Sequence, residues 1–514
     1  MIQDLQQSLP DPAAVADICI VGAGAAGIVL AVEFARRGKS VLLLEGGGAE
    51  IEESSQDSYT SELAGLPHRG VHAGRFRAKG GTTTKWGGQI LELDAIDFEQ
   101  RPGIAESGWP FPKSELARHY ERALELEGLA GVTRQDEAVW REVGEQMPKF
   151  PSLEPYFSRW CPEPNFAFLH CHALEQHPGI TLWLHANAVE PQIEGEAMRG
   201  IRCRTLTGVE ATFCAETFIF CLGGIESSRF FLQPALAGLP GNRAGLIGKH
   251  FQDHIDCNVA IVEPLDAERF HRAFDNVFSR GFKYHPKLRL APAVQAEHGT
   301  LNVAATMTFI SEADEALAQL KTTAKDLLRG RLGEVSAADA AFAVRHLPLI
   351  ARQTWRYSAR HRAYNPPDAR IFLRVHCEQE PTSRSSITLS DARDSLGLLR
   401  TRLDWQISER ELATIRQYVQ VATRSLAGVA RIVPDQDLLS GSSTFLARCD
   451  DSNHHMGGMR MSASAATGAV DPNLRLYGLD NTYVCSSAVF PTSGFSNPTH
   501  TLLALAVRLS EHLG

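Results

Sequence analysis

The sequence has no hydrophobic run long enough to span a membrane, and its first 17 residues contain neither lysine nor arginine. A transmembrane helix needs about 20 consecutive apolar residues. The longest apolar run here, residues 18–32, is interrupted by three glycines. A secretory signal needs a basic segment followed by an apolar one. These absences predict a cytoplasmic protein with no transmembrane segment.

Paired cysteines and an excess of positive charge are also missing. The ten cysteines include no Cys-x-x-Cys pair, and Cys19, Cys221 and Cys485 lie in apolar runs, which favours buried free thiols and no metal site. The net charge of −9 gives no overall attraction to nucleic acid. The 514 residues, 44% of them hydrophobic, predict a globular protein with more than one domain.

The stretch 17–48 has the pattern of a dinucleotide-binding βαβ unit. A short apolar run leads into Gly22, Gly24 and Gly27, which stand in GxGxxG spacing before a helix-like segment. In this pattern the first glycine permits a tight turn, the second lets the backbone approach a pyrophosphate, and the third lets the helix pack on the strand. A second apolar run ends in Glu45, which is placed to accept hydrogen bonds from a ribose hydroxyl. The complete unit predicts a dinucleotide site.

A glycine-rich loop, RAKGGTTTKWGGQ at residues 77–89, suits backbone that lies flat against a planar ligand. On glycine density alone, a surface loop explains it equally well. Residues 181–193 alternate like a strand, and residues 212–229 have the pattern of a buried strand, a Gly-Gly turn and a helix. This return to a parallel-sheet pattern extends the predicted α/β fold.

Residues 258–450 differ in character, because strand-like runs alternate with helical segments. One helix is predicted to begin after Ser408, whose capping box with Glu411 precedes an apolar stripe. We therefore expect a second domain inserted between parts of the first. Within it, residues 321–362 carry nine basic and three acidic residues. A solvated pair of helices is the favoured explanation, and a docking surface for an acidic partner or a membrane is the alternative.

The last part of the chain holds candidates for chemistry. His454 and His455 stand beside two glycines, which would put a neutral base next to backbone with room for a ligand. By itself, a histidine pair is more often structural. The Asn-Pro dipeptide at 497–498 predicts the start of a final helix, whose N-terminus can stabilise negative charge on a bound cofactor.

Taken in order, these motifs resemble those of the glucose-methanol-choline (GMC) oxidoreductases, FAD-dependent enzymes that oxidise alcohols. The resemblance covers most of the chain. It rests on GAGAAG at 22–27 with Glu45, the loop at 77–89, CLGGIESSRFFL at 221–232, GKHFQDH at 248–254, residues 377–397 and the last sixty residues. The tail AVFPTSGFSNPTHTLLAL looks most like the branch of pyranose oxidases and related bacterial sugar or glycoside oxidoreductases.

The resemblance implies a fold and a division of the chain. We expect an α/β protein in which a Rossmann-like FAD-binding domain with a parallel sheet is interleaved with an α+β substrate domain that has a mainly antiparallel sheet. The FAD-binding domain would comprise residues 1–105, 176–257 and 451–514, the last part with the catalytic residues. Residues 106–175 would form a cap segment of the substrate domain, and 258–450 its main part.

Roles for single residues are implied as well. His454, the first histidine of the family's H-x-x-G motif, would be the general base, and Asn497, where the family has His or Asn, would orient the substrate hydroxyl rather than cap the helix. The residues expected to bind FAD are Gly22, Gly24, Ala25, Ala26, Gly27, Glu45, Gly46, Gly81, Thr82, Thr83, Thr84, Trp86, Gly87, Gly88, Ala188, Val189, Gly223, Glu226, Ser487, Ala488, Asn497, Pro498 and Thr499. The residues expected to line the substrate pocket are His455, His500 and Gln89.

Two departures from the family pattern matter. Lys85 stands where pyranose oxidases carry a histidine bonded to FAD, so non-covalent FAD is expected. Ser486 replaces an Asp that many members have, which weakens the transfer of the contact made there.

The implied reaction converts a hydroxyl to a carbonyl by hydride transfer to flavin N5, on a sugar, glycoside, aminoglycoside or cyclitol. An apolar or steroid alcohol is the alternative within the same chemistry. A non-redox flavoprotein, either a lyase or a binding protein, is the alternative from another class. The electron acceptor would be O2 or another, unknown acceptor, and no nucleic-acid partner is expected.

Overall fold

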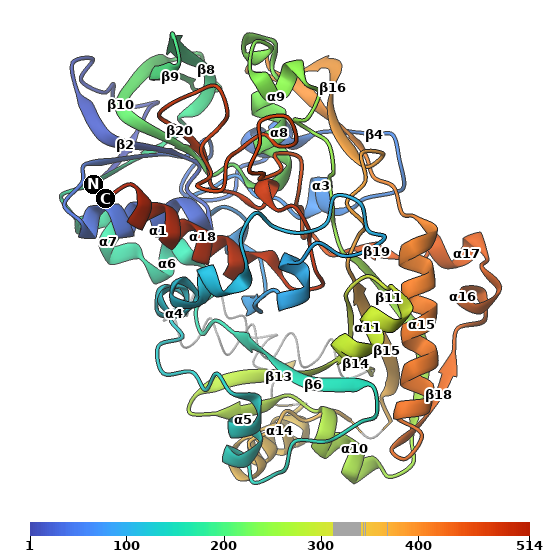
Figure 1. The fold of residues 1–514 in the computed structure, drawn as a ribbon. Helices are drawn as coiled ribbons and strands as arrows, with labels where there is room; N and C mark the ends of the chain where they lie inside the picture. Colours follow the sequence, from blue (N-terminus) through green and yellow to red (C-terminus); the bar gives the residue numbers. More distant parts are fainter. Residues whose placement is uncertain (312–340, 343, 345, 367) are drawn as a thin grey trace.

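The computed structural model describes residues 1–514 except 312–340, 343, 345 and 367. Residues 321–340 of the basic segment therefore lie outside the described residues. Two large sheets and one small sheet organise the described chain, with the first large sheet in the upper half of Figure 1 and the second in the lower half. Both termini lie at the first sheet.

The first large sheet has a parallel centre. Its strand order is β1-β7-β3-β2-β10-β9-β8, with β20 also paired to β10. All neighbours from β1 to β10, and the β10–β20 pair, are parallel, whereas β9 and β8 are antiparallel. The strands are β1 (Ile2–Asp4), β2 (Val15–Val21), β3 (Val41–Leu44), β7 (Ile180–Leu184), β8 (Asn187–Glu194), β9 (Ala197–Arg204), β10 (Glu210–Phe220) and β20 (Thr482–Val484).

Three helices pack together beside this sheet: α1 (Ala25–Arg36), α4 (Ala117–Leu126) and α18 (Pro498–His512). Helix α8 (Gly223–Leu232) follows β10 after the predicted Gly-Gly turn. The β2–α1–β3 unit and the β10–α8 unit thus form as the sequence predicts. The prediction of a single strand over 181–193 was wrong, because the chain turns at His185 (φ 55°) and β3, β2, β10 and β9 lie between β7 and β8 in the sheet. Asp4 and Glu52 hold the His185 imidazole at 2.9 and 3.1 Å.

The second large sheet is antiparallel, in the order β18-β11-β15-β14-β13-β6-β5, with β12 on β13 and β19 on β11. Its strands are β5 (Gln89–Ile90), β6 (Leu153–Trp160), β11 (Ile255–Pro264), β12 (Val277–Ser279), β13 (Phe282–Leu290), β14 (Val303–Ile310), β15 (Arg370–Cys377), β18 (Ala430–Pro434) and β19 (Asp450–Asp451). Helix α15 (Glu409–Ser425) buries Ile415, Val419 and Ala422 against one face. The predicted capping box of Ser408 and Glu411 is present.

The small sheet contains β16 (Ser386–Arg393), β17 (Leu399–Asp404) and β4 (Glu62–Leu63). The remaining described α-helices are α2 (Glu53–Gln56), α3 (Gly70–Ala73), α5 (Asp136–Glu142), α6 (Phe166–Leu169), α7 (Cys171–Gln176), α9 (Pro240–Arg243), α10 (Ala267–Phe274), α11 (Pro292–His298), α14 (Leu347–Arg360), α16 (Gln436–Ser440) and α17 (Ser443–Leu446). Short 3-10 helices cover Asp57–Tyr59, Gly81–Thr84, Ala95–Phe98, Lys113–Leu116, Pro234–Leu236 and Ser487–Val489.

The predicted fold class, α/β with one parallel and one mainly antiparallel sheet interleaved in sequence, is confirmed. All ten cysteines are free, and Cys19, Cys221 and Cys485 are buried as predicted. Among the described helices, none has both the length and the apolarity needed to cross a bilayer.

Candidate functional site

The turn between β2 and α1 forms an open cradle. Gly22 has φ 107°, and a Cβ there would lie 2.5 Å from the carbonyl oxygen of Cys221. A Cβ on Gly27 would lie 1.9 Å from the carbonyl oxygen of Gly22, so only glycine lets the helix approach the strand this closely. At Gly24 no described atom lies within 4 Å of the Cβ position. The cradle therefore leaves space above the start of α1, where free N–H groups can meet a phosphate.

Glu45, directly after β3, borders this cradle. Its two carboxylate oxygens accept hydrogen bonds from the backbone N–H groups of Ala23, at 3.0 Å, and Gly47, at 2.9 Å. Burial raises the pKa of the Glu45 carboxyl, and the hydrogen bond from Gly47 and the charge of Arg77 oppose that shift. Each oxygen keeps a second lone pair, which can accept a hydrogen bond from a sugar hydroxyl.

The cradle opens into a cavity of about 240 Å³. The predicted cofactor residues that line it are Gly22, Gly24, Ala25, Ala26, Glu45, Gly46, Gly81, Thr82, Thr83, Trp86, Ala188, Gly223, Glu226, Ser487, Pro498 and Thr499. The other predicted cofactor residues, Gly27, Thr84, Gly87, Gly88, Val189, Ala488 and Asn497, lie outside its lining. Of these, Gly87 and Gly88 pack against the segment 160–164, and Lys85 is exposed.

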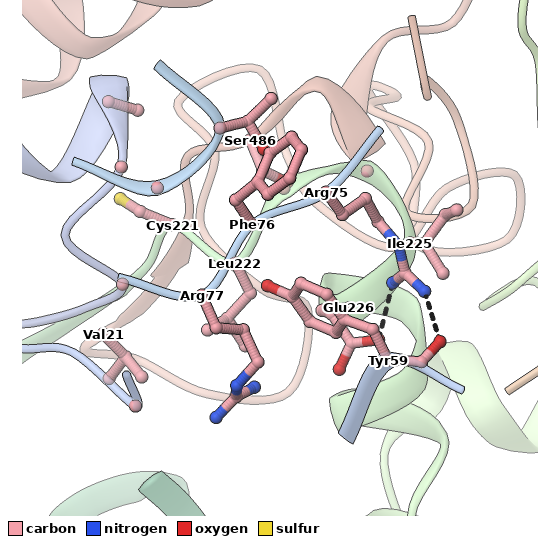
Figure 2. A pocket seen from close by; sticks show the side chains of 18 of the residues that line it. Val21, Tyr59, Arg75, Phe76, Arg77, Cys221, Leu222, Ile225, Glu226 and Ser486 are labelled. Atoms are coloured by element: carbon pink, nitrogen blue, oxygen red, sulfur yellow. Dashed lines mark hydrogen bonds and ion pairs between the residues drawn. The ribbon is translucent and has the colours of Figure 1, made fainter. Parts of the chain in front are cut away.

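Sequence reasoning missed a cationic wall of the same cavity. Arg75, Arg77 and Tyr59 line it, and Figure 2 shows them beside Glu226. The Glu226 carboxylate accepts hydrogen bonds from Arg75 at 2.8 Å and from Arg229 at 3.0 Å. Burial raises the pKa of Glu226, but these arginine charges outweigh burial, so its pKa lies below the ordinary value. The run RFRAK at residues 75–79, which leads into the glycines of the loop, was the signal that could have revealed this wall.

The predicted base and its predicted partner meet at the start of α18. The amide nitrogen of Asn497 lies 3.0 Å from Nε2 of His454. Helix α18 begins with Pro498 and receives no cap hydrogen bond from the Asn497 side chain. Asn497 is therefore turned toward His454, and its neighbours Pro498 and Thr499 line the cavity.

A second imidazole, which sequence reasoning did not single out, holds the other side of His454. Nδ1 of His254 lies 2.9 Å from Nδ1 of His454. Burial lowers the pKa of His254 to about 4. The pKa of His454 is also well below its ordinary value, through burial first and then through the positive charges of His254, His376 and Lys287. His454 is therefore neutral at pH 7 and able to accept a proton. The motif GKHFQDH contains His254 but does not reveal its partner.

The buried carboxylate of Asp253 positions this histidine pair. One of its oxygens accepts the backbone N–H groups of His254, at 2.7 Å, and of His454, at 3.0 Å. The other oxygen lies 3.2 Å from Nε2 of His68. One side chain thereby fixes the loop that carries His454 to the segment directly before β11.

The three residues predicted to line the substrate pocket lie in different parts of the structure. His455 lines the cavity and is buried beside His68, with ring centroids 5.3 Å apart. His500 lies outside the lining, and its Nδ1 is 2.8 Å from the Glu127 carboxylate. Gln89, on β5 of the antiparallel sheet, donates a hydrogen bond to Ser158 at 2.6 Å.

The antiparallel sheet presents a polar face toward His454. On β11, β13, β14 and β15, alternate residues such as Cys257, Leu288 and Val375 belong to the core under α15. The intervening residues, on the opposite face, include the polar side chains Asp256, His285, Lys287, Thr306, Arg374 and His376, together with Ala304 and Phe372. Side-chain nitrogens of His254, His376 and His454 lie within 4.8 Å of one another, which places this polar face beside the histidine pair.

Comparisons with known proteins find oxidoreductases. Residues 381–506 match the family model of the GMC oxidoreductases. The chain is 22% identical, over 97% of its length and 95% of the relative's, to 2-methyl-1,2-propanediol dehydrogenase of Mycolicibacterium austroafricanum. Over 149 residues, 29% of this chain and 28% of the relative, it is 26% identical to C-glycoside 3-oxidase of Microbacterium trichothecenolyticum.

Solved structures show the same fold. Pyridoxine 4-oxidase from Mesorbium loti has a TM-score of 0.60 at 16% identity, over 96% of this chain and 98% of that one. A formate oxidase variant from Aspergillus oryzae RIB40, studied for FAD modification, has a TM-score of 0.56 at 14% identity, over 98% and 99% of the two chains.

Proposed function

We propose, as a premise, that this chain is a GMC-type, FAD-dependent oxidoreductase acting on CH–OH groups. On this premise, we propose that it oxidises a hydroxyl of a sugar, glycoside, aminoglycoside or cyclitol to a carbonyl. The observation that carries the proposal is the contact between His454 and Asn497 beside a polar strand face. The partial likeness to a C-glycoside 3-oxidase supports a sugar-like substrate.

The residues of the cavity fit FAD. Gly22, Gly24 and Glu45 would hold the nucleotide end, because the turn leaves room for a pyrophosphate and the carboxylate keeps free lone pairs. Trp86 and Thr499 would border its remaining part, with the N-terminus of α18 close by. When bound, FAD supplies the two-electron oxidant for the carbinol carbon. Lys85 in place of a histidine makes the binding non-covalent.

The chain's own residues handle the hydroxyl group. With the Asn497 amide nitrogen facing it, Nε2 of His454 carries a lone pair. A substrate hydroxyl would replace this amide contact and give its proton to that nitrogen. Asn497 donates a hydrogen bond that orients the hydroxyl oxygen. His254 accepts the Nδ1 proton of His454 and so fixes the ring and its tautomer.

The polar face argues for a polyhydroxy substrate over the apolar or steroid alternative. Lys287 and Thr306 are buried there, and Asp256 and His376 are partly buried. A steroid ring placed against these groups would remove them from water without replacing their hydrogen bonds, which costs free energy at each group.

The test begins with an absorbance spectrum of the purified protein before and after acid precipitation. A flavin spectrum that acid releases into solution establishes non-covalent FAD. Anaerobic addition of sugars, glycosides, aminoglycosides, cyclitols and steroid alcohols follows. Bleaching by a polyhydroxy compound supports the proposal, bleaching by steroids alone contradicts the substrate class, and a flavin that no alcohol bleaches favours the non-redox alternative. Exposing the reduced enzyme to air then distinguishes O2 from another electron acceptor.

A further inference from the structure

Lys287 is a buried cation near the predicted base and forms no ion pair with the described residues. It lies on β13 and is 5% exposed. Within the described part of the chain, no carboxylate lies within ion-pairing distance of its ammonium group, and the nearest acidic influence is that of Asp256. Asp256 is itself engaged, because Nε of Arg374 lies 2.6 Å from its carboxylate. Burial without a partner lowers the pKa of Lys287 to about 8. A buried charge of this kind is costly unless a binding partner supplies the opposite charge.

The same face carries other polar atoms that lack partners. Tyr156 stands directly opposite Lys287 in the β6–β13 register. The hydroxyl of Tyr156, Nε2 of His254 and Nδ1 of His376 are buried and have no hydrogen-bond partner among the described residues. Buried polar groups in native proteins are nearly always paired, so several such atoms on or beside the face that carries Lys287 indicate a place for a ligand.

The charges at this place select an anion over a cation. The carboxylates nearest the face are already paired with arginines, since Asp256 pairs with Arg374, and Asp94 and Glu154 share Arg289. The three imidazoles of His254, His376 and His454 lie close enough to hold a metal ion. The ammonium of Lys287 would repel such an ion, and a metal on His454 would occupy the lone pair that the proposed reaction needs. The Lys287 ammonium, the Tyr156 hydroxyl and the N–H groups of the neutral imidazoles can all donate hydrogen bonds to an anion.

We propose that Lys287 is a substrate-binding residue that pairs with a carboxylate, so that the alcohol oxidised at His454 belongs to a sugar acid or a glycoside of one. This inference rests on the proposed function and narrows its substrate class. A carboxylate matches the single positive charge of Lys287, whereas a phosphate dianion would leave one charge uncompensated in a buried site. The hydroxyl of Tyr156 can donate a hydrogen bond to the same carboxylate.

Matched substrate pairs test this inference on the FAD-loaded enzyme. Methyl glucuronide and methyl glucoside, and methyl galacturonide and methyl galactoside, differ only in the carboxylate. Isothermal titration calorimetry under anaerobic conditions gives the dissociation constant of each, and sugar phosphates are included as a second kind of anion. In the wild type, we expect at least one acid to bind about tenfold or more tightly than its neutral counterpart.

Lys287→Met should abolish this preference by weakening the acid far more than the neutral member, and Lys287→Arg should keep part of it. Lys283→Met is the matched control, because Lys283 lies on the same strand and the same face but stacks on Trp160 at 3.6 Å. This control should bind the acids as the wild type does. The wild-type preference is a test in itself if Lys287→Met does not fold.

Several outcomes would overturn the inference. These are equal affinities within every pair, acids that do not bind at all, sugar phosphates that bind more tightly than the acids, or a preference that survives in Lys287→Met. If neutral sugars still bleach the flavin in those cases, the proposed function stands without the inference. If acids bind through Lys287 but no alcohol bleaches the flavin, the proposed function fails and the anion site remains.

Discussion

Nε2 of His454 lies 3.0 Å from the amide nitrogen of Asn497, although 43 residues separate them in the chain. The contact joins the loop after β19 to the first turn of α18, and Asp253 fixes that loop through the backbone N–H of His454. The imidazole and the amide are thereby held side by side, next to the cavity that Pro498 and Thr499 line.

His454→Ala should lower the rate of flavin reduction by about 10²- to 10⁴-fold, because it removes the general base. FAD should remain bound, since His454 is not part of the cavity lining. Stopped-flow absorbance under anaerobic conditions measures the rate, and the flavin-to-protein absorbance ratio measures occupancy. Near-normal flavin reduction in this variant would disprove the assignment of the base.

Asn497→Leu should slow flavin reduction by about 10²- to 10³-fold, the usual cost of losing one donor aimed at a reacting oxygen. Asn497→His, the other residue type that the family places here, should retain most of the activity because it can still donate. Both variants keep Pro498, and the Asn497 side chain makes no cap hydrogen bond, so α18 should be unaffected in both. Equal activity of the two variants would show that the side chain does not orient the hydroxyl.

Gly24→Val and Gly27→Ala should fail in different ways. Gly24 faces open space in the cradle, so a side chain there should weaken FAD binding by about tenfold or more while the apoprotein stays folded. An alanine in place of Gly27 would put its Cβ 1.9 Å from the Gly22 carbonyl oxygen, so this substitution should destabilise the fold by about 1–3 kcal/mol. Flavin titration of the apoprotein and urea unfolding separate the two effects, and the opposite pattern would contradict the geometry of the turn.

His254 should make the protein less stable in acid. Burial lowers its folded-state pKa from 6.5 to about 4, so the unfolded chain binds a proton first as the pH falls. The contribution of His254 to the free energy of unfolding is constant above pH 6.5 and falls between pH 6.5 and 4. Below pH 4 it falls no further. The full shift corresponds to about 3 kcal/mol. Urea unfolding of wild type and His254→Asn across this range should give a shallower slope for the variant. Parallel curves would contradict the lowered pKa.

Arg101→Ala should destabilise the fold strongly. Its guanidinium donates a hydrogen bond of 2.6 Å to the carboxylate of Glu378. Glu378 is buried and directly follows β15. Removing one partner of a buried ion pair leaves a buried charge and costs about 3–5 kcal/mol. Arg118→Ala is the control, because its pair with Glu511 is exposed and should contribute about 0–1 kcal/mol. Thermal unfolding measures both, and equal shifts would show that burial of the pair is unimportant.

Local patterns in the sequence predicted local structure well. The spacing of Gly22, Gly24 and Gly27 follows from steric limits within a single turn, and that turn is present. The capping box at Ser408 is likewise a contact between residues three positions apart. The alternating run at 181–193 misled because alternation does not show where a strand breaks, and the turn at His185 depends on distant carboxylates.

The sequence by itself determined the nucleotide-binding turn, the two kinds of sheet and the candidate pair His454 and Asn497, because each depends on short-range spacing or on a motif that can be read along the chain. Only the tertiary structure decided what surrounds that pair. His254 meets His454 through the junction of β11 with the C-terminal loop, and Lys287 faces Tyr156 through the pairing of β13 with β6. Strand register between distant segments depends on the packing of the whole sheet, so no local pattern could reveal the polar face where we place the substrate.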